Sequence, residues 1–524
     1  MAFKLNHLDL VLTAITLVVS FASFQWSRRS REKLPLPPGP RKIPILGNLP
    51  AMPTKNEWIQ YHKWCKEYKT DILHLDAAGT SIVVVATSEL ATELLERRSS
   101  IYSGRARMPM IKELMGWDYV FGLMDYGSYW RKHRRLMHHS FHPSAARNYE
   151  PHIMKATHNL LNRFLKYPHS PVENLRHLVA ESILSIAYGI NVQEENDPFV
   201  KLAEDAVAPL LAAAIPGTFA VDFFPWLKYV PEWVPGASFK RKAREWKHLS
   251  LGLLDKPYQA TKDAMASGTA SMSFVFESLE KLEAGTSDDA YQEDYIKRTA
   301  GTMYTAGTDT TSSAIANCIL ALLQHPEVLA KAQKELDSVV KPGRLPDYDD
   351  QDAMPYVTAM VKEILRYRVI VPMAIPHVLS VEDEFEGYRL PVNSIVVPNA
   401  WAMLHDENVY EDPFKFNPER FIGSDGKLDY SKARDPFHAC WGFGRRVCPG
   451  RFMAFSAVWI AVASIIFVFD IEKFKDEKTG EVIEPLDEQD NALVLMPKPF
   501  RCSLKPRSKE KEELVRRVVL LERT

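Results

Sequence analysis

The sequence predicts a mainly α protein with a small β part, preceded by one N-terminal transmembrane helix. Helical spacing of apolar residues dominates from about Thr87 onward. The β-branched run from Ser81 to Val85, close after Gly79, is typical of strands. Leu10 to Trp26 contains 17 residues without a charge, which is long enough for a helix to span a bilayer.

Basic residues follow this apolar stretch. Arg28, Arg29, Arg31 and Lys33 would retain the remainder of the chain on the cytosolic side. We therefore expect a membrane anchor over residues 1–33, a proline-rich hinge over 34–50 and one large domain over 51–524. A cleaved secretory signal is the alternative, which the position of the basic cluster after the apolar stretch disfavours.

Composition excludes several classes of protein. The 65 basic and 66 acidic residues give a net charge of −1, so no global field favours nucleic acid as a partner. The five cysteines are few, odd in number and widely spaced, which argues against a disulfide framework and for a reducing compartment. No pair of cysteines has the CxxC spacing of a zinc site.

One cysteine stands in an unusual loop, W-G-F-G-R-R-V-C-P-G, which runs from Trp441 to Gly450. Cys448 is the candidate metal ligand, because Arg445, Arg446 and a helix starting after Pro449 would stabilise a thiolate. Gly444 and Gly450 would allow the backbone to approach a flat ligand closely. The alternative is a buried core cysteine beside a solvated basic turn.

Two further clusters suggest a bound anion and a proton relay. Trp130 and Arg134 share one helix face at i and i+4, which suits a carboxylate or a haem propionate; a solvated basic face is the alternative. Ala300 to Leu323 predicts a long helix, locally loosened between Ala306 and Thr311. Asp309 beside Thr310 could relay protons there, unless both face solvent.

Three other stretches predict structure. Glu363 with Arg366 and Arg420 would form a buried clamp, although an i,i+3 pair is often a surface pair. The apolar run Phe452 to Phe469 is expected to be a core helix and not a second membrane span. The aromatic and basic segment Phe223 to Trp246 suits a membrane interface or internal packing equally.

These stretches together resemble the cytochrome P-450 family of haem-thiolate monooxygenases, over essentially the whole chain after the anchor. Gly444, Arg446, Cys448 and Gly450 match the family's cysteine loop, with Trp441 where phenylalanine is usual. Three further patterns of the family are also matched. The long-helix pattern is matched by Ala306, Gly307, Asp309, Thr310 and Thr311, the clamp by Glu363, Arg366 and Arg420, and the tryptophan-arginine pair by Trp130 and Arg134. Longer stretches, such as 100–105 and 239–243, are similar to microsomal members of fungal, basidiomycete secondary metabolism.

The resemblance implies a cytochrome P-450 fold with haem b, whose iron takes Cys448 as axial ligand in the catalytic domain 51–524. It further implies that Trp130, Arg134, His377 and Arg446 hold propionates, and that Asp309 and Thr310 deliver protons to dioxygen. The loosened helix at Gly307 would make room for dioxygen. Trp441 keeps an aromatic ring near the sulfur and adds an N–H donor.

The resemblance also implies partners. Electrons would come from an NADPH-cytochrome P-450 reductase, with cytochrome b5 as a further candidate, on a single-pass protein of the endoplasmic reticulum membrane with a cytosolic catalytic domain. Arg131, Lys132, Arg135 and Arg445 would receive the acidic face of that partner. A haem-thiolate isomerase or dehydratase, or a membrane haem-binding protein without turnover, is the alternative.

The substrate is expected to be a hydrophobic small molecule such as a terpenoid, an indole or another aromatic. By analogy the pocket walls would come from the ranges that follow: Ile101 to Tyr126, Ala206 to Phe223, Met303 to Thr310, Val369 to Ile375 and Asn491 to Leu495. Tyr119, Tyr126 and Tyr304 would be polar handles in these largely apolar walls.

Overall fold

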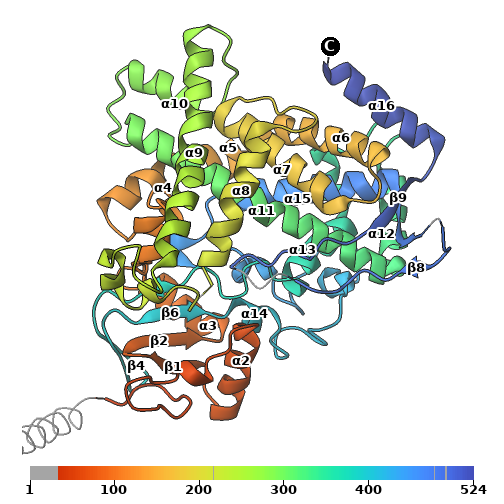
Figure 1. Ribbon diagram of the computed structural model, residues 1–524. Coiled ribbons are helices and arrows are strands. Elements are labelled where there is room, and N and C mark those ends of the chain that lie inside the picture. Colours follow the sequence, from red (N-terminus) through yellow and green to blue (C-terminus); the bar gives the residue numbers. More distant parts are fainter. Residues whose placement is uncertain (1–33, 216, 477, 490–492, 524) are drawn as a thin grey trace, which may run out of the picture.

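A computed structural model describes residues 34–215, 217–476, 478–489 and 493–523 of the chain. Most of this part is helical, and the short strands form three small sheets (Figure 1). The prediction of a mainly α fold with a small β part is confirmed. The predicted membrane anchor, residues 1–33, lies outside the described residues.

The helices vary from single turns to the 32 residues of α11. They are α2 (Glu57–Tyr68), α3 (Ser88–Ala91), α4 (Ser128–Phe141), α5 (Pro143–Ala146), α6 (Glu150–Lys166), α7 (Pro171–Tyr188), α8 (Pro198–Ala213), α9 (Ser238–Ala266), α10 (Phe274–Glu283), α11 (Glu293–Gln324), α12 (Pro326–Val339), α13 (Pro355–Tyr367), α14 (Ala400–Leu404), α15 (Arg451–Val468) and α16 (Lys509–Arg523). Shorter helical elements include the π-helices η2 (Thr92–Arg97) and η3 (Pro109–Leu114) and the 3-10 helix η11 (Gly444–Arg446).

The β-branched run predicted to form strands does so. β1 (Ile72–Ala77) and β2 (Thr80–Val85) pair antiparallel across a turn that contains Gly79. β2 then pairs in parallel with β6 (Ile395–Pro398), Ile82 opposite Ile395, which gives the sheet order β1-β2-β6-β3. The remaining strands are β3 (His377–Val378), β4 (Asp383–Phe385), β5 (Tyr388–Leu390), β7 (Phe469–Lys475), β8 (Val482–Ile483) and β9 (Cys502–Pro506).

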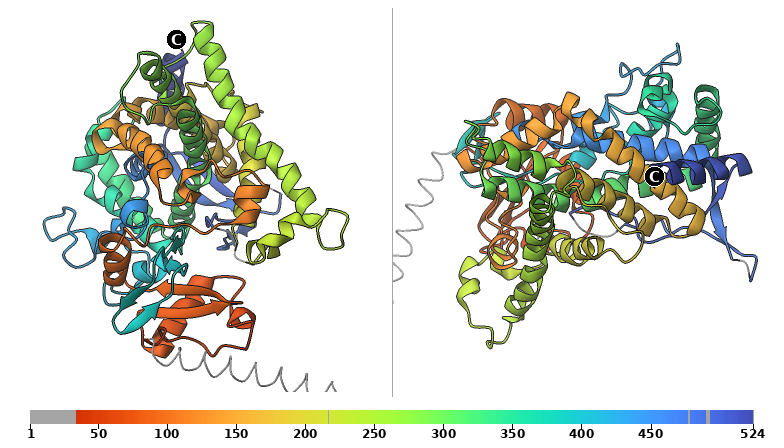
Figure 2. Two further views of the ribbon diagram at one scale, coloured as in Figure 1. Left: turned by 90° about the vertical axis from the view of Figure 1, so that its left-hand side faces the viewer. Right: turned by 90° about the horizontal axis from the view of Figure 1, so that it is seen from above.

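Helix α11 runs through the middle of the helical part, with α7 and α15 beside it (Figure 1). It begins seven residues before the predicted start at Ala300, because Glu293 and Asp294 favour a helix N-terminus by their charge. It ends at Gln324, one residue beyond the predicted end at Leu323, and α12 leaves at 111°. Figure 2 shows from two further sides how the other helices surround it.

The apolar run after the cysteine loop forms α15, and its residues Val458–Val468 are all buried. Within the described ranges α15 is long and apolar enough to cross a membrane, and α11 with α12 meets the same criterion only as a bent pair. Because α15 packs against α6, α11, α12 and α13, the structure agrees with the prediction of a core helix.

The predicted clamp is confirmed. Both oxygens of Glu363 accept from Arg366, at 2.8 and 2.9 Å, and Oε1 also accepts from Arg420 Nε at 3.1 Å. The side chains of Glu363 and Arg366 are fully buried. Arg366 Nη1 additionally donates to the carbonyls of Leu404 and Pro413, at 2.9 and 2.7 Å. The clamp therefore attaches α13 to the irregular segment that precedes the cysteine loop.

The segment expected to be a hinge lies against strands of two sheets. The N–H of His74 donates to the carbonyl of Pro38 at 2.8 Å, and the N–H of Arg389 donates to that of Pro35 at 2.8 Å. Asn48 Oδ1 accepts the N–H of Asp76 at 2.9 Å. These bonds hold residues 35–48 against β1 and β5.

Arg366→Ala should lower the free energy of unfolding by about 3–5 kcal/mol, because Glu363 would stay buried with too few donors. Denaturant unfolding of the solubilised protein, followed by circular dichroism, measures the change. Arg516→Ala is the matched control, since Arg516 forms an exposed i,i+4 pair with Glu512 on α16 and such pairs contribute little. Equal effects of the two substitutions would contradict the clamp's role.

Candidate active site

The loop that contains Cys448 is folded back on itself. The N–H of Cys448 donates to the carbonyl of Trp441 at 2.8 Å. Gly444 has a φ of +53°, and a Cβ there would lie 1.9 Å from the carbonyl oxygen of Leu95 in η2. Close packing of the loop on η2 thus requires a glycine at position 444. A Cβ on Gly450 would meet no described atom within 4 Å.

Helix α4 contacts this loop through the two residues predicted to share a face. Arg134 Nη1 donates to the carbonyl of Val447, next to Cys448, at 2.7 Å. Trp130 is buried, and the guanidinium of Arg446 lies 4.5 Å from the centre of its ring. The indole N–H of Trp130 is buried without a hydrogen-bond partner among the described residues. Such a donor needs an acceptor that protein side chains do not supply here.

Positive groups gather beside Trp130. Arg446 donates through Nε and Nη2 to the carbonyl of Ser103, at 2.9 and 2.7 Å, while its Nη1 is buried and has no partner in the described part of the chain. Arg105 is also buried and donates to the carbonyls of Gly122 and Pro376, at 3.0 and 2.8 Å. Burial lowers the pKa of Arg446 to about 10 and lowers that of Arg105 strongly.

His377 belongs to the same cluster. Its Nδ1 lies 2.7 Å from the carbonyl of Tyr102. Burial, followed by the charge of Arg105, holds the pKa of His377 well below its usual value, so the ring is neutral near pH 7. Asp125 is the carboxylate that acts on both Arg105 and Arg446. Two buried guanidiniums against one carboxylate favour a further anion.

Cys448 differs from the other four cysteines in its electrostatic surroundings. It is half-buried at the end of the loop. Burial raises the pKa of its thiol, but the N–H of Gly450 and the guanidiniums of Arg134 and Arg451 oppose that rise. At Cys440 the charge of Asp435 adds to the raised pKa and that of Lys362 opposes it, and no cation opposes the raised pKa of the other three thiols, Cys65, Cys318 and Cys502. Cys448 is therefore the cysteine that the structure best prepares to carry negative charge.

Helix α11 is continuous across Ala306 to Thr311, so the predicted loosening is not found. Threonine hydroxyls bond to carbonyls one turn earlier, as in the 3.0 Å bond from Thr310 Oγ1 to the carbonyl of Ala306. Ala306 is exposed although its helix is mostly buried. Burial raises the pKa of Asp309, and the charge of Arg176 opposes the rise. Asp309 and Thr310 are both half-buried.

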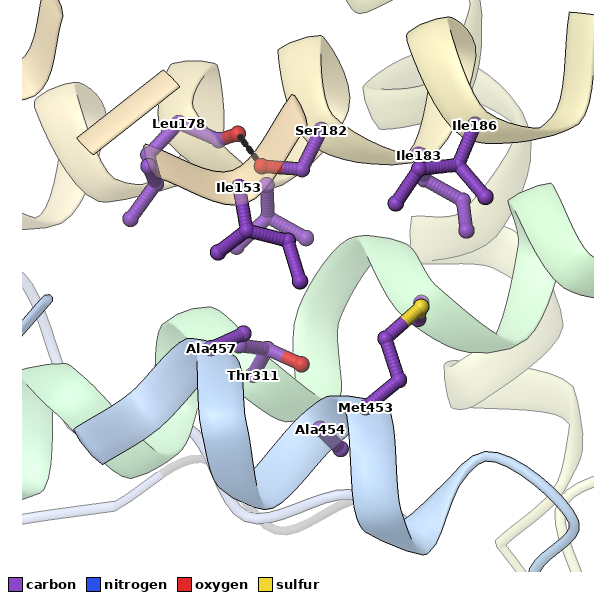
Figure 3. Close-up of a pocket in the computed structure, with 11 residues that line it drawn as sticks. Ile153, Leu178, Ser182, Ile183, Ile186, Thr311, Met453, Ala454 and Ala457 are labelled. Carbon is purple, nitrogen blue, oxygen red and sulfur yellow. Dashed lines mark hydrogen bonds between the residues drawn. The ribbon is translucent and has the colours of Figure 1, made fainter. Parts of the chain in front are cut away.

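Gly307 lies at an apolar cavity between four helices (Figure 3). Ile153 of α6, Ile183 of α7 and Met453 of α15 line the cavity with Gly307 and Thr311 of α11. A Cβ on Gly307 would lie 3.3 Å from Ile183 Cγ1. The glycine thus serves the approach of α7 to α11. Of the segments expected to wall a substrate pocket, Met303 to Thr310 contributes to this cavity; Asn491 lies outside the described residues.

The three tyrosines expected to be polar handles already have partners. Tyr119 Oη donates to the carbonyl of Ser250 at 3.3 Å, and Tyr304 Oη donates to that of Phe199 at 2.5 Å. Tyr126 Oη accepts from Arg445. Tyr119 and Tyr304 thus use their hydroxyl protons to hold neighbouring elements together, whereas the hydroxyl of Tyr126 accepts from Arg445 and can still donate its own proton.

Sequence reasoning missed two parts of this site. Arg105 lacks a recognisable spacing to the cysteine loop, and only its place within the stretch 100–105 could have drawn attention to it. Lys362, next to Glu363, is buried among the rings of Tyr430 and Phe437, 4.7 and 4.1 Å from their centres, and pairs with Asp435. That pair fixes the chain shortly before Trp441, whose ring packs edge-on against Phe437.

Comparison with known proteins now decides the family. A sequence model of the cytochrome P-450 family matches residues 37–504. This chain belongs to the cytochrome P-450 family. It is 45% identical over 490 residues to a cytochrome P-450 monooxygenase of Postia placenta, covering 93% of this chain and 94% of the relative.

Two other relatives are similar along almost their whole length. A cytochrome P-450 monooxygenase of Rhodocybe pseudopiperita is 40% identical, with 93% of this chain and 92% of the relative covered. The tryptamine 4-monooxygenase of Psilocybe cyanescens is 39% identical, with 96% and 99% covered. This cytochrome P-450 is thus an oxidoreductase of fungal monooxygenase type.

The family implies haem held by a cysteine thiolate, and the residues present fit that group. The indole N–H of Trp130 and Nη1 of Arg446 are buried donors that have no acceptor among the described residues. Ala306 is exposed in the middle of a core helix. A Cβ on Gly450, two residues after Cys448, would have open space around it. An apolar, flat group with anionic ends would satisfy all four observations.

Trp130→Phe should weaken haem retention by about tenfold or more, since it removes one hydrogen bond to a charged group, worth about 1.5–3 kcal/mol. The rate of haem transfer to an excess of a haem-scavenging apoprotein measures retention. Trp117→Phe is the matched control, because Trp117 also has a buried N–H without a partner in the described chain but packs against Tyr119. Equal rates for both variants would contradict the assignment of Trp130.

Proposed function

We propose that this cytochrome P-450 transfers one oxygen atom from dioxygen to a hydrophobic secondary metabolite, such as a terpenoid, an indole or another aromatic. The observation that supports this proposal most is the setting of Cys448. The guanidiniums of Arg134 and Arg451 act on its thiol, and the same site contains buried N–H donors without hydrogen-bond partners among the described residues. We assign Cys448 as the axial ligand of haem b. When bound, haem supplies the activation of dioxygen and the transfer of oxygen to substrate.

The chain's own residues would hold the haem and orient it. Trp130, Arg134, Arg446 and His377 would bind its anionic groups, and the position of Arg105 supports a fifth contact of this kind. Trp441, Gly444 and Gly450 frame Cys448. The N–H of Trp441 is buried and lacks a partner among the described residues, so this side chain is also available to a bound group.

Asp309 and Thr310 would move protons. A raised pKa means that the carboxyl of Asp309 keeps its proton to a higher pH than an exposed aspartate does. Thr310 is one turn from the exposed Ala306, so its hydroxyl lies on the same helix face. If the hydroxyl of Thr310 gave up its hydrogen bond to the carbonyl of Ala306, it could donate its proton to a group on that face.

The polar groups of the expected pocket walls support a hydrophobic substrate. The hydroxyl protons of Tyr119 and Tyr304 are donated to backbone carbonyls within the protein. Neither of these two hydroxyls is then available to donate to a polar substrate. The similarity to a tryptamine 4-monooxygenase supports indoles among the candidate substrates.

We propose an NADPH-cytochrome P-450 reductase as the electron donor, with cytochrome b5 as a further donor.

We place the protein on the endoplasmic reticulum membrane, anchored once by residues 1–33, with 34–50 as the connection and 51–524 as the cytosolic catalytic domain. Trp226, Tyr229 and Trp233 support contact with the bilayer, since they are 63, 76 and 83% exposed. Figure 2 shows their segment at the periphery, after α8.

Membranes that contain this protein and the reductase should form an NADPH-dependent product carrying one ¹⁸O atom from ¹⁸O₂, with a terpenoid, indole or aromatic substrate. Mass spectrometry identifies the product.

Thr310→Ala should keep haem and substrate binding but divert electrons to peroxide, because it removes the hydroxyl of the proton relay. The ratio of product to NADPH consumed should fall severalfold.

Two results would contradict the proposal. A product formed equally without NADPH and without ¹⁸O would favour a rearrangement or dehydration. No NADPH-dependent product from a broad terpenoid, indole and aromatic panel would favour a haem-binding protein without turnover.

A further inference from the structure

The basic residues predicted to receive an electron donor lie on one surface around α4. Arg131 and Arg445 lie over the ring of Tyr126, with guanidinium carbons 5.6 and 5.2 Å from its centre. Arg135 follows Arg131 by one helical turn, so both point to the same side of α4. These three arginines and Lys132 form what we call the cationic surface, which adjoins the Cys448 loop through Arg445.

Half of the cationic surface is already paired within the chain. Arg135 Nη1 lies 2.8 Å from Asp288 Oδ1 and 3.2 Å from Asp289 Oδ1. Lys132 Nζ lies 3.0 Å from Asp289 Oδ2. Both aspartates belong to the loop that joins α10 to α11, which lies beside α4 (Figure 1). Two of the four cations predicted to receive an acidic partner thus already have a carboxylate of this chain beside them.

The two aspartates have different roles in their loop. Asp288 Oδ1 also accepts the N–H of Ala290 at 3.0 Å, so it shapes the turn before α11. Asp289 directs its carboxylate to Lys132 and Arg135, and its side chain is 58% exposed. Exposed ion pairs of this kind are weak and are screened by salt. A carboxylate from another protein can therefore replace Asp289 at little cost.

The remaining cations differ from this pair. Arg131 is exposed and, in the described chain, its recorded contact is with the Tyr126 ring. Arg445 bonds to the hydroxyl of Tyr126 and keeps its charge uncompensated by a described carboxylate. An acidic protein that approaches the Cys448 loop would meet Arg131 and Arg445 first. It would then compete with Asp289 for Lys132 and Arg135.

We infer that the Asp288-Asp289 loop is an internal competitor for the acidic electron donor, and that docking of the donor displaces Asp289 from Lys132 and Arg135. This inference rests on the proposed reductase partner. The loop would limit the affinity of the complex and so favour release of the donor after electron transfer. It would also reject weakly acidic proteins that cannot displace it.

Asp289→Asn should strengthen binding of NADPH-cytochrome P-450 reductase by about three- to tenfold at low ionic strength, because the competitor loses its charge while its shape is kept. Binding of the haem-loaded full chain to the reductase is measured by titration in lipid nanodiscs. The rate of iron reduction under carbon monoxide gives a second readout that needs no substrate. The gain should shrink at high salt.

Asp205→Asn is the matched control, since it removes one exposed carboxylate from α8, where Asp205 pairs with Lys201. The affinity of this variant should equal that of the wild type. In a Lys132→Gln, Arg135→Gln background, Asp289→Asn should bring no gain. Unchanged or weaker binding by Asp289→Asn, with normal binding of the wild type, would overturn this inference alone. A wild type that binds no reductase would overturn the proposed donor as well.

Discussion

The buried charge of Glu363 is the constraint on which the cysteine loop depends. A carboxylate without solvent contact persists only when donors surround it, and here Arg366, Arg420 and the N–H of Asn417 do so. Arg366 at the same time binds the carbonyls of Leu404 and Pro413. One side of α13 thus specifies the path of a segment that has little regular structure of its own.

The neighbouring residue on α13 extends this control toward the cysteine. Lys362 pairs with Asp435 inside a group of aromatic rings, and Phe437 of that group packs on Trp441. From Trp441 the chain turns back so that its carbonyl meets the N–H of Cys448. The position of the sulfur is therefore set by two adjacent side chains of a rigid core helix. Contacts from α4 then complete the loop, through Arg134 and Val447.

Local spacing was sufficient to predict the parts that depend on one element. The i and i+4 pair Trp130 and Arg134, the i and i+3 pair Glu363 and Arg366, and the strand hairpin around Gly79 all lie where the sequence placed them. Such features follow from helix and strand geometry alone. The family resemblance supplied the order of these motifs and thereby the fold.

Features that depend on long-range packing could not be predicted. Arg105 joins the site because the segment before η3 folds against Pro376, and no periodicity encodes that approach. Gly444 faces the backbone of Leu95, and the pairing of Arg135 with Asp288 joins residues 153 positions apart. The helix over Ala306 to Thr311 stays intact because packing of α11 in the core outweighs weak propensity.

The central claim is that Cys448, alone among the cysteines, binds the haem iron. The carbon monoxide difference spectrum of the reduced protein tests it most directly, since a strongly red-shifted Soret band reports a thiolate ligand. The wild type and Cys440→Ala, which removes the neighbouring thiol of the same segment, should show the band, and Cys448→Ala should lack it. Persistence of the band in Cys448→Ala, or its loss in Cys440→Ala with haem retained, would contradict the account.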